Sequence, residues 1–257
     1  MKRLLSLFDY SGTWSAPFRK KGWDVIQWDI KLSEYMDIMT LDSVETVLEL
    51  FENVDGIISA PPCTHFTKSG AQYWKLKDED GRTWEMLQLV HQVQKLADLF
   101  RPTDPEFDGT FFWCIENPVG RLQKLVPELG DAIFFHPWEF AGYTNPTEED
   151  LKRLDIIRLK DGKGVTDEEN ELILKVNAYT KQTGLWGEFN RDLVKKPITK
   201  VKASAQGTFT QRYGGDSVRT KELRSNTPSG FAEAFCEANH DYQCFIDPET
   251  GMFFDYE

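Results

Sequence analysis

Four short apolar runs in the first half of the chain predict buried β-strands. They cover residues 3–8, 24–28, 55–60 and 110–115, and each ends in a cluster of polar or turn-forming residues, as buried parallel strands do. Between the last two runs, residues 83–101 carry apolar side chains at helical spacing, which predicts a helix. Strands that alternate with helices predict a doubly wound α/β sheet, in which ligands bind beyond the carboxyl ends of the strands.

The second half of the chain has a different pattern. Residues 144–176 are highly charged, with a Gly-rich turn at 161–164 between two segments that can form amphipathic helices. The stretch from there to residue 225 is poor in long apolar runs. We therefore expect a core over residues 1–143, a charged insertion with a small irregular lobe over 144–225, and a return to the core over 226–257.

Cys63 follows the third apolar run directly after Pro61 and Pro62. Two prolines stiffen the backbone in front of the cysteine and hold its thiol at the mouth of the sheet. A thiolate is the nucleophile suited to adding to carbon 6 of a pyrimidine and leaving again afterwards. An ordinary buried cysteine is the competing interpretation for a lone Cys, and the Pro-Pro-Cys context favours the nucleophile.

Glu116 and Asn117 follow the fourth apolar run. Carboxyl ends of parallel strands meet at one edge of a sheet, so Glu116 is expected on the same edge as Cys63. A carboxylic acid there can hydrogen-bond to N3 and the exocyclic amine of cytosine and hold a proton at N3. A solvated or structural glutamate is the alternative interpretation.

The turn after the first apolar run contains one glycine, Gly12, and the second run ends in Asp29. A tight turn after the first strand lets the backbone approach an adenosine-containing cofactor, and an acid after the second strand can accept from ribose hydroxyls. This pattern has low specificity when it is taken alone.

In chain order, LFDYSG, Asp29, APPCTHF, ENPVG and SNTPSGFAEAF resemble the motifs of the DNA cytosine-5 methyltransferase family. The resemblance indicates a short and divergent, phage-type member. It implies an α/β fold with a Rossmann-like, S-adenosylmethionine-dependent methyltransferase sheet as the catalytic core, and a small second lobe that recognises the DNA target. The implied reaction is transfer of a methyl group from S-adenosylmethionine to carbon 5 of cytosine in DNA through a covalent cysteine adduct.

The resemblance also implies roles for individual residues. The catalytic residues are Cys63 and Glu116. The cofactor-binding residues are Phe8, Ser11, Gly12, Asp29, Asp37, Asp42 and Asn226. The substrate-binding residues are Pro62, Asn117, Lys181 and Arg212. The last two are alternatives for one role, because the family's Gln-Arg-Arg motif has no clean copy here and both residues lie near its expected place.

Charge bears on the expected partner. The net charge of −12 opposes binding to a polyanion, because Lys and Arg usually supply most of the affinity for phosphates. The distribution is uneven, however: residues 193–225 hold eight basic and two acidic residues, whereas 237–257 hold six acidic residues and no Lys or Arg. We expect residues 195–224 to face the cleft of Cys63 and Glu116 and to contact DNA, and residues 68–82 to form a candidate lid.

Two rival hypotheses remain open. The first is an enzyme that modifies cytosine in a nucleotide, in single-stranded DNA or in RNA, and the second is a catalytically weak binding protein with the same fold. The four cysteines show no paired CxxC spacing, and no long apolar run follows the N-terminal residues. We therefore expect a monomer without metal or membrane contact, in the cytoplasm of a bacterium or a virus-infected cell.

Overall fold

The computed structural model describes residues 1–104, 109–160, 164–199, 201, 225–242, 245–246 and 253–254. The chain divides into two compact units. Unit 1 consists of Met1–Ile133, Gly184–Asp192 and Cys236–Glu257, and unit 2 of Phe134–Thr183 and Leu193–Phe235. The first division therefore lies ahead of the expected one at residue 143, and unit 1 contains a second return, at 184–192, that the sequence pattern does not signal.

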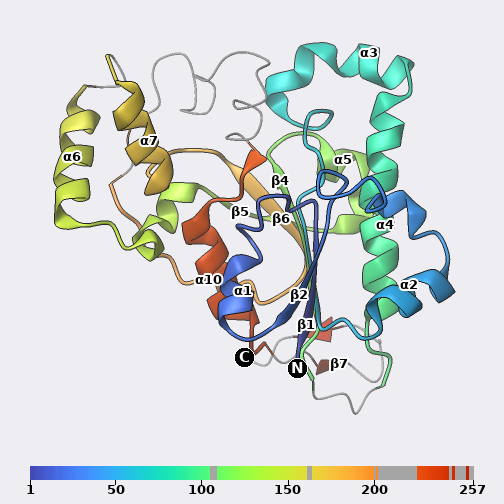
Figure 1. Ribbon diagram of the computed structural model, residues 1–257. Helices are drawn as coiled ribbons and strands as arrows, with labels where there is room; N and C mark the ends of the chain where they lie inside the picture. Colours follow the sequence, from blue (N-terminus) through green and yellow to red (C-terminus); the bar gives the residue numbers. More distant parts are fainter. Residues whose placement is uncertain are drawn as a thin grey trace. The chain divides into compact units, whose positions relative to one another are not determined.

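A six-stranded mixed sheet forms the centre of the fold (Figure 1), and its strand order is β2-β1-β3-β4-β6-β5. The strands are β1 (Arg3–Leu7), β2 (Asp24–Trp28), β3 (Gly56–Ser59), β4 (Phe112–Pro118), β5 (Ile133–Phe135) and β6 (Thr183–Glu188). Strand β1 pairs in parallel with β2 and β3, and β3 pairs in parallel with β4. The predicted α/β class and the four predicted strands are thus confirmed. Two short strands, β7 (Phe245–Ile246) and β8 (Phe253–Phe254), pair antiparallel.

The helices of unit 1 are α1 (Ala16–Lys20), α2 (Val44–Phe51), α3 (Trp74–Glu79), α4 (Arg82–Phe100) and α5 (Leu122–Leu125). Unit 2 contains α6 (Glu148–Leu159) and α7 (Asp167–Lys175), and α10 (Ser229–Asn239) continues past the division between the units. Short 3-10 helices are η1 (Ile38–Thr40), η2 (Lys68–Tyr73), η3 (Pro127–Leu129), η4 (Pro137–Glu139) and η5 (Ala141–Thr144).

Alternation along the strands of unit 1 builds a core on both faces of its sheet. Helices α2 and α4 cover one face (Figure 1), where Leu5, Ile57 and Ile115 are buried against their apolar side chains. On the other face, the ring of Phe18 in α1 stacks on Phe112 of β4 with 5.7 Å between ring centroids. Burial on both faces explains why these strands read as nearly continuous apolar runs.

Helices α6 and α7 of unit 2 confirm the prediction of two amphipathic helices in the charged segment. Thr147 and Thr166 each cap a helix by accepting a hydrogen bond from the backbone N–H three residues later, which satisfies one of the free donors of the first turn. The apolar sides of both helices are buried together, with Leu154 and Ile173 among the residues concerned. Residues 161–163 of the predicted turn lie outside the described residues.

Two details differ from the sequence pattern. Strand β4 continues to Pro118, so Glu116 and Asn117 belong to the strand instead of following it. Residues 68–82, expected as a loop, contain η2 and α3, and α4 begins at Arg82 after Gly81, which adopts φ 85°. A positive φ is a conformation that glycine reaches at little cost, and this explains an abrupt helix start without a side-chain cap.

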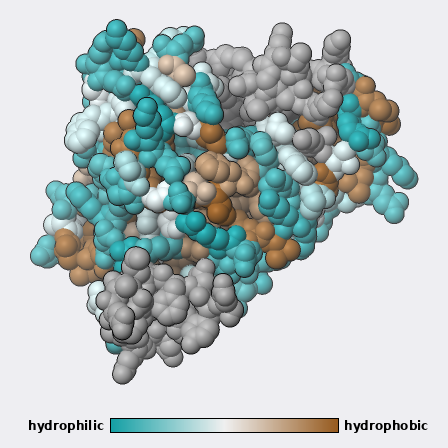
Figure 2. All heavy atoms as spheres, turned by 180° about the vertical axis from the view of Figure 1, so that it is seen from behind, coloured by the Kyte–Doolittle hydropathy of each residue, from teal (hydrophilic) through white to brown (hydrophobic). Residues whose placement is uncertain are grey.

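The surface is predominantly hydrophilic on the face that Figure 2 shows, with hydrophobic residues in separate groups. Among the helices that the structure describes, none combines the length and the apolar character that crossing a membrane requires.

Candidate functional site

The four parallel strands of unit 1 bring the predicted site residues to one edge of the sheet. Residues paired across neighbouring strands form a row at this edge: Trp28, Leu7, Ser59 and Ile115. Asp29, Phe8 and Glu116 each directly follow a member of that row. Parallel strands lie about 4.8 Å apart, so the register alone places these three predicted residues along one edge.

The turn after β1 is organised by Asp9, to which sequence reasoning assigned no role. Its buried carboxylate accepts hydrogen bonds from Ser6 Oγ at 3.0 Å, from Ser15 N at 3.0 Å and from Ser15 Oγ at 2.8 Å. Three donors on one carboxylate fix the path of the chain between β1 and α1. An acid placed directly after a buried strand is the signal that could have pointed to Asp9.

Two positions in this turn have left-handed backbone, Phe8 with φ 58° and Gly12 with φ 67°. A Cβ atom at position 12 would lie 3.0 Å from Gln27 Nε2, so a side chain there would be both strained and crowded. Gln27 Nε2 itself donates to Asp9 O at 2.7 Å. The single glycine is therefore the one that this turn requires. Ser11 is exposed, and its hydroxyl donates to Thr13 Oγ1 at 2.9 Å.

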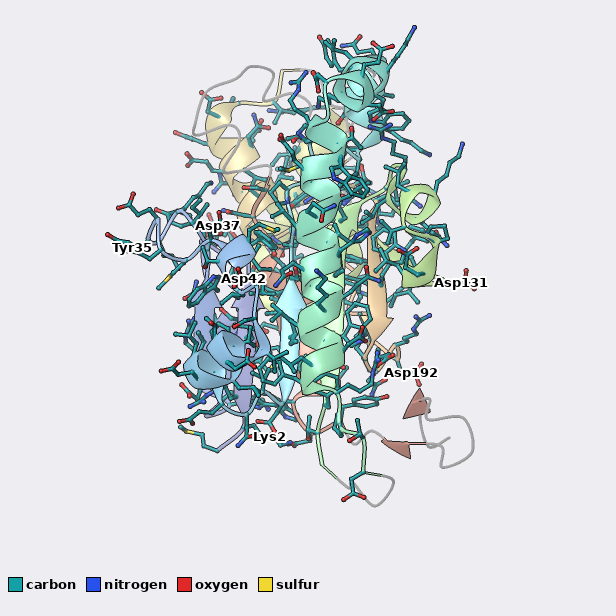
Figure 3. The ribbon with its side chains drawn as sticks, turned by 90° about the vertical axis from the view of Figure 1, so that its right-hand side faces the viewer. Lys2, Tyr35, Asp37, Asp42, Asp131 and Asp192 are labelled. Carbon is teal, nitrogen blue, oxygen red and sulfur yellow. The ribbon has the colours of Figure 1, made fainter. Side chains whose placement is uncertain are left out.

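The acids predicted for the cofactor lie directly after β2 and further along the connection from β2 to α2. Asp29 is 8% exposed, and its Oδ1 accepts from Lys31 N at 2.8 Å. Asp37 caps η1 by accepting from Met39 N at 2.9 Å, and Asp42 follows η1 as an exposed residue. Figure 3 shows Asp37 and Asp42 on this connection. A carboxylate has about four lone-pair sites, so Asp29 and Asp37 can accept further hydrogen bonds.

Cys63 stands apart from the other described cysteines in its accessibility. Cys63 is half-buried, whereas Cys114 and Cys236 are buried. Burial raises the pKa of the Cys114 thiol well above its ordinary value, the nearby charge of Glu116 raises it further, and Arg191 opposes the shift. Since the thiolate is the reactive form, Cys114 is held as an inert thiol, and Cys63 is the described cysteine that a substrate can reach.

Hydrogen bonds and a β-bridge join the Cys63 loop, residues 60–67, to the β4 end segment, residues 116–121. Asn117 Nδ2 donates to Pro61 O at 3.0 Å, and Asn117 is fully buried. Arg121 N donates to Phe66 O at 2.8 Å, and Thr67 forms an isolated antiparallel bridge with Gly120. The two predicted catalytic segments are therefore fastened to each other directly. Pro62, predicted to contact the substrate, is exposed within this loop.

Glu116 and Asn117 lie on opposite faces of β4. Because side chains alternate along a strand, Asn117 shares the face of Ile115, which packs in the core beneath α4, and Glu116 shares the face of Cys114. Glu116 is 5% exposed. In such a setting water competes weakly for a hydrogen bond, so a bond to a bound base counts for more than in solvent.

The surroundings of His65, two residues after Cys63, favour the neutral form of its imidazole. Burial lowers its pKa from the ordinary value of 6.5, and the positive charges of Lys77, Arg82 and Arg121 lower it further. Its Nδ1 is buried and has no hydrogen-bond partner within the part of the chain that the structure describes. The sequence pattern had assigned no role to His65.

The other predicted residues belong to unit 2. Lys181 is half-buried between α7 and β6, and Asn226 is exposed shortly before α10. Of the basic stretch, Lys195 Nζ lies 3.2 Å from Glu139 Oε2, and Lys196 Nζ lies 3.7 Å from the ring centroid of Tyr143. Arg212 and all the other basic residues of this stretch lie outside the described residues.

Comparisons with known proteins add no assignment: neither models of protein families nor curated proteins match this chain. In the described ranges, no group of three or more His, Cys, Asp or Glu side chains is arranged to hold a metal ion. The function has to be inferred from the motifs and from the geometry of unit 1.

Proposed function

We propose that the protein transfers a methyl group from S-adenosylmethionine to carbon 5 of cytosine in DNA, with Cys63 as the nucleophile. One observation carries the proposal: an accessible cysteine and a buried glutamate lie on segments that are hydrogen-bonded to each other, at the carboxyl edge of neighbouring parallel strands. Ligands of open α/β sheets bind at this edge. The order of the two motifs along the chain is the one that the cytosine-5 methyltransferase resemblance requires.

Each of the two residues has a defined task. The Cys63 thiolate adds to carbon 6, the electron pair of the 5,6 double bond forms a 4,5 double bond, and the pair of the 3,4 double bond moves to N3, which takes up the proton that Glu116 holds there. S-adenosylmethionine, when bound, supplies the methyl group that carbon 5 takes up. Loss of the carbon 5 proton to a base then restores the 5,6 double bond and expels Cys63 as a thiolate.

The turn after β1 and the acid after β2 fit the cofactor. Positive φ at Phe8 and Gly12 makes the turn after β1 tight, and a tight turn at this place lets the backbone approach a cofactor closely. Asp29 is buried at the end of the neighbouring strand and retains lone pairs for the ribose hydroxyls. These residues would hold the adenosine part, while Cys63 and Glu116 would hold the base.

A transfer assay tests the proposal. The protein is incubated with labelled S-adenosylmethionine and, separately, with duplex DNA, single-stranded DNA, RNA and cytidine nucleotides. We expect label at carbon 5 of cytosine with duplex DNA. If only another of these substrates is labelled, the proposed reaction stands and that substrate takes the place of duplex DNA. If none is labelled, the proposed activity is wrong.

Cysteine variants connect the activity to the site. Cys63→Ser should lose nearly all transfer because a hydroxyl is a far weaker nucleophile at neutral pH. Cys236→Ala, in α10, is the matched control and should keep the activity. DNA that contains 5-fluorocytosine should trap an adduct on Cys63, because fluorine does not leave as a proton does. An adduct located on another residue would remove Cys63 from the mechanism.

A further inference from the structure

We infer that Arg121 is a positioning residue for Cys63, which it acts upon through the backbone of the Cys63 loop. This inference deepens the proposed function and rests on it for the role of Cys63 as nucleophile. Arg121 occupies the last position of the β4 end segment, and neither the motifs nor the family resemblance gives it a task.

The carbonyl groups of the Cys63 loop accept hydrogen bonds from several donors. Cys63 O accepts from the backbone N–H groups of Phe66 at 3.0 Å and Thr67 at 3.1 Å. Thr64 O accepts from Lys77 Nζ at 2.6 Å. His65 O accepts from Arg121 Nε at 3.0 Å, and Phe66 O accepts from Arg121 N at 2.8 Å. Four consecutive carbonyls are thus occupied, and Arg121 alone supplies the donors for two of them.

Contacts with α3 and α4 hold the Arg121 side chain in place. Its Nη1 and Nη2 atoms each donate to a different oxygen of Asp78 at 2.8 Å, and Nη2 also donates to Thr83 Oγ1 at 2.9 Å. The guanidinium lies over the Trp74 ring, 4.7 Å from its centroid. The Arg121 side chain is 10% exposed. A planar guanidinium with these partners is held in one orientation, so its Nε–H group points at His65 O.

The Cys63 loop needs such a partner because two prolines precede the cysteine. Pro61 and Pro62 have no backbone N–H, so the approach to Cys63 cannot be fixed by its own donors. The position of the thiol therefore depends on bonds accepted by the carbonyls on either side of it. Arg121 links those on the far side to α3 and α4, and the same segment carries Glu116.

The test uses the full chain and measures how fast the Cys63 thiol is alkylated, which does not depend on methyl transfer. Wild type, Arg121→Lys and Arg121→Gln are treated with iodoacetamide, and mass spectrometry follows the alkylation of each cysteine. Arg82→Lys is the matched control, because Arg82, the first residue of α4, pairs with Asp80 at 2.5 Å, and within the described residues it has no hydrogen bond to the Cys63 loop. The buried Cys114 and Cys236 report unfolding within the same samples.

We expect both Arg121 variants to alkylate Cys63 several-fold faster than wild type, while Cys114 and Cys236 stay protected. In the transfer assay kcat should fall about tenfold or more, the factor that corresponds to losing one hydrogen bond from a charged donor, with the KM for S-adenosylmethionine unchanged. Arg121→Lys should lose less activity than Arg121→Gln, because lysine keeps the positive charge although it lacks the planar guanidinium.

Two results would overturn the inference. In the first, Cys63 is alkylated at the same rate in the Arg121 variants as in Arg82→Lys. In the second, Cys63, Cys114 and Cys236 become reactive together, which is the mark of a purely structural residue. The alkylation needs neither cofactor nor nucleic acid. An altered Cys63 rate in a protein that methylates no substrate would therefore defeat the proposed function and leave the positioning role standing.

Discussion

Replacing Gly120 by alanine tests whether the contact between the two catalytic segments is as close as the structure indicates. A Cβ atom at position 120 would lie 1.8 Å from Phe66 O, and contacts below 3.0 Å essentially never occur. The two segments would have to separate by at least 1.2 Å, the difference between those distances. Such a shift breaks the 2.8 Å bond from Arg121 N to Phe66 O.

The expected cost has two parts. Overpacking costs about 1–3 kcal/mol, and one lost hydrogen bond costs about 0.5–1.5 kcal/mol, so we expect Gly120→Ala to lower the free energy of unfolding by about 1.5–4.5 kcal/mol. Transfer activity should fall by more than the folded fraction does, because Cys63 moves relative to Glu116. Urea denaturation followed by tryptophan fluorescence gives the first quantity, and initial rates at low temperature give the second.

Gly70→Ala serves as the matched control, since its Cβ would lie 3.3 Å from Thr64 O, another carbonyl of the same loop. A contact of that length needs an adjustment of only a few tenths of an ångström, so this variant should be close to wild type. Equal stability and activity of the two variants would show that the segments are not packed as closely as described here.

Three further predictions concern single residues. Glu116→Gln should lower kcat strongly and leave the affinity for S-adenosylmethionine nearly unchanged in calorimetry, and the reverse pattern would exchange the roles of Glu116 and Asp29. Asp29→Ala should weaken cofactor binding by about 1–3 kcal/mol, the cost of leaving hydrogen-bonding groups unpaired, and unchanged affinity would leave this acid without a function. The pKa of His65, followed by NMR, should lie below 6.5 in the folded protein. The unfolded chain then binds more protons below pH 6.5, so the contribution of His65 to stability is present above that pH and is lost as the pH falls through the folded pKa. A pKa at or above 6.5 would contradict this assignment.

Strands β1 to β4, and the place of Cys63 shortly after β3, could be predicted because buried parallel strands leave a direct pattern in the sequence. The first three apolar runs end within one residue of their strands, and the carboxyl ends of parallel strands must share an edge. Strand β4 is longer than its apolar run because the buried Glu116 and Asn117 continue it. Their burial depends on neighbours from other segments, which no local pattern encodes.

Helix α3 and the role of Arg121 could not be predicted for a related reason. Helix α3 covers only Trp74–Glu79, and isolated helices of that length are not stable in water. Its contacts with Arg121, through the ring of Trp74 and the carboxylate of Asp78, come from a segment more than forty positions away. The chemistry of a strand end can thus be anticipated from sequence, whereas the tertiary contacts that hold it appear only in the fold.

A single segment sets both halves of the proposed chemistry. Asn117 donates to Pro61 O ahead of Cys63, and Arg121 donates to the carbonyls of His65 and Phe66 after it. Glu116 lies on the same segment, directly before Asn117. Because the two prolines before Cys63 supply no backbone N–H, the bonds from the β4 end segment contribute directly to the distance between thiol and carboxyl. Substitutions in residues 117–121 should therefore impair the reaction even where the thiol, the carboxyl and the cofactor turn are all unchanged.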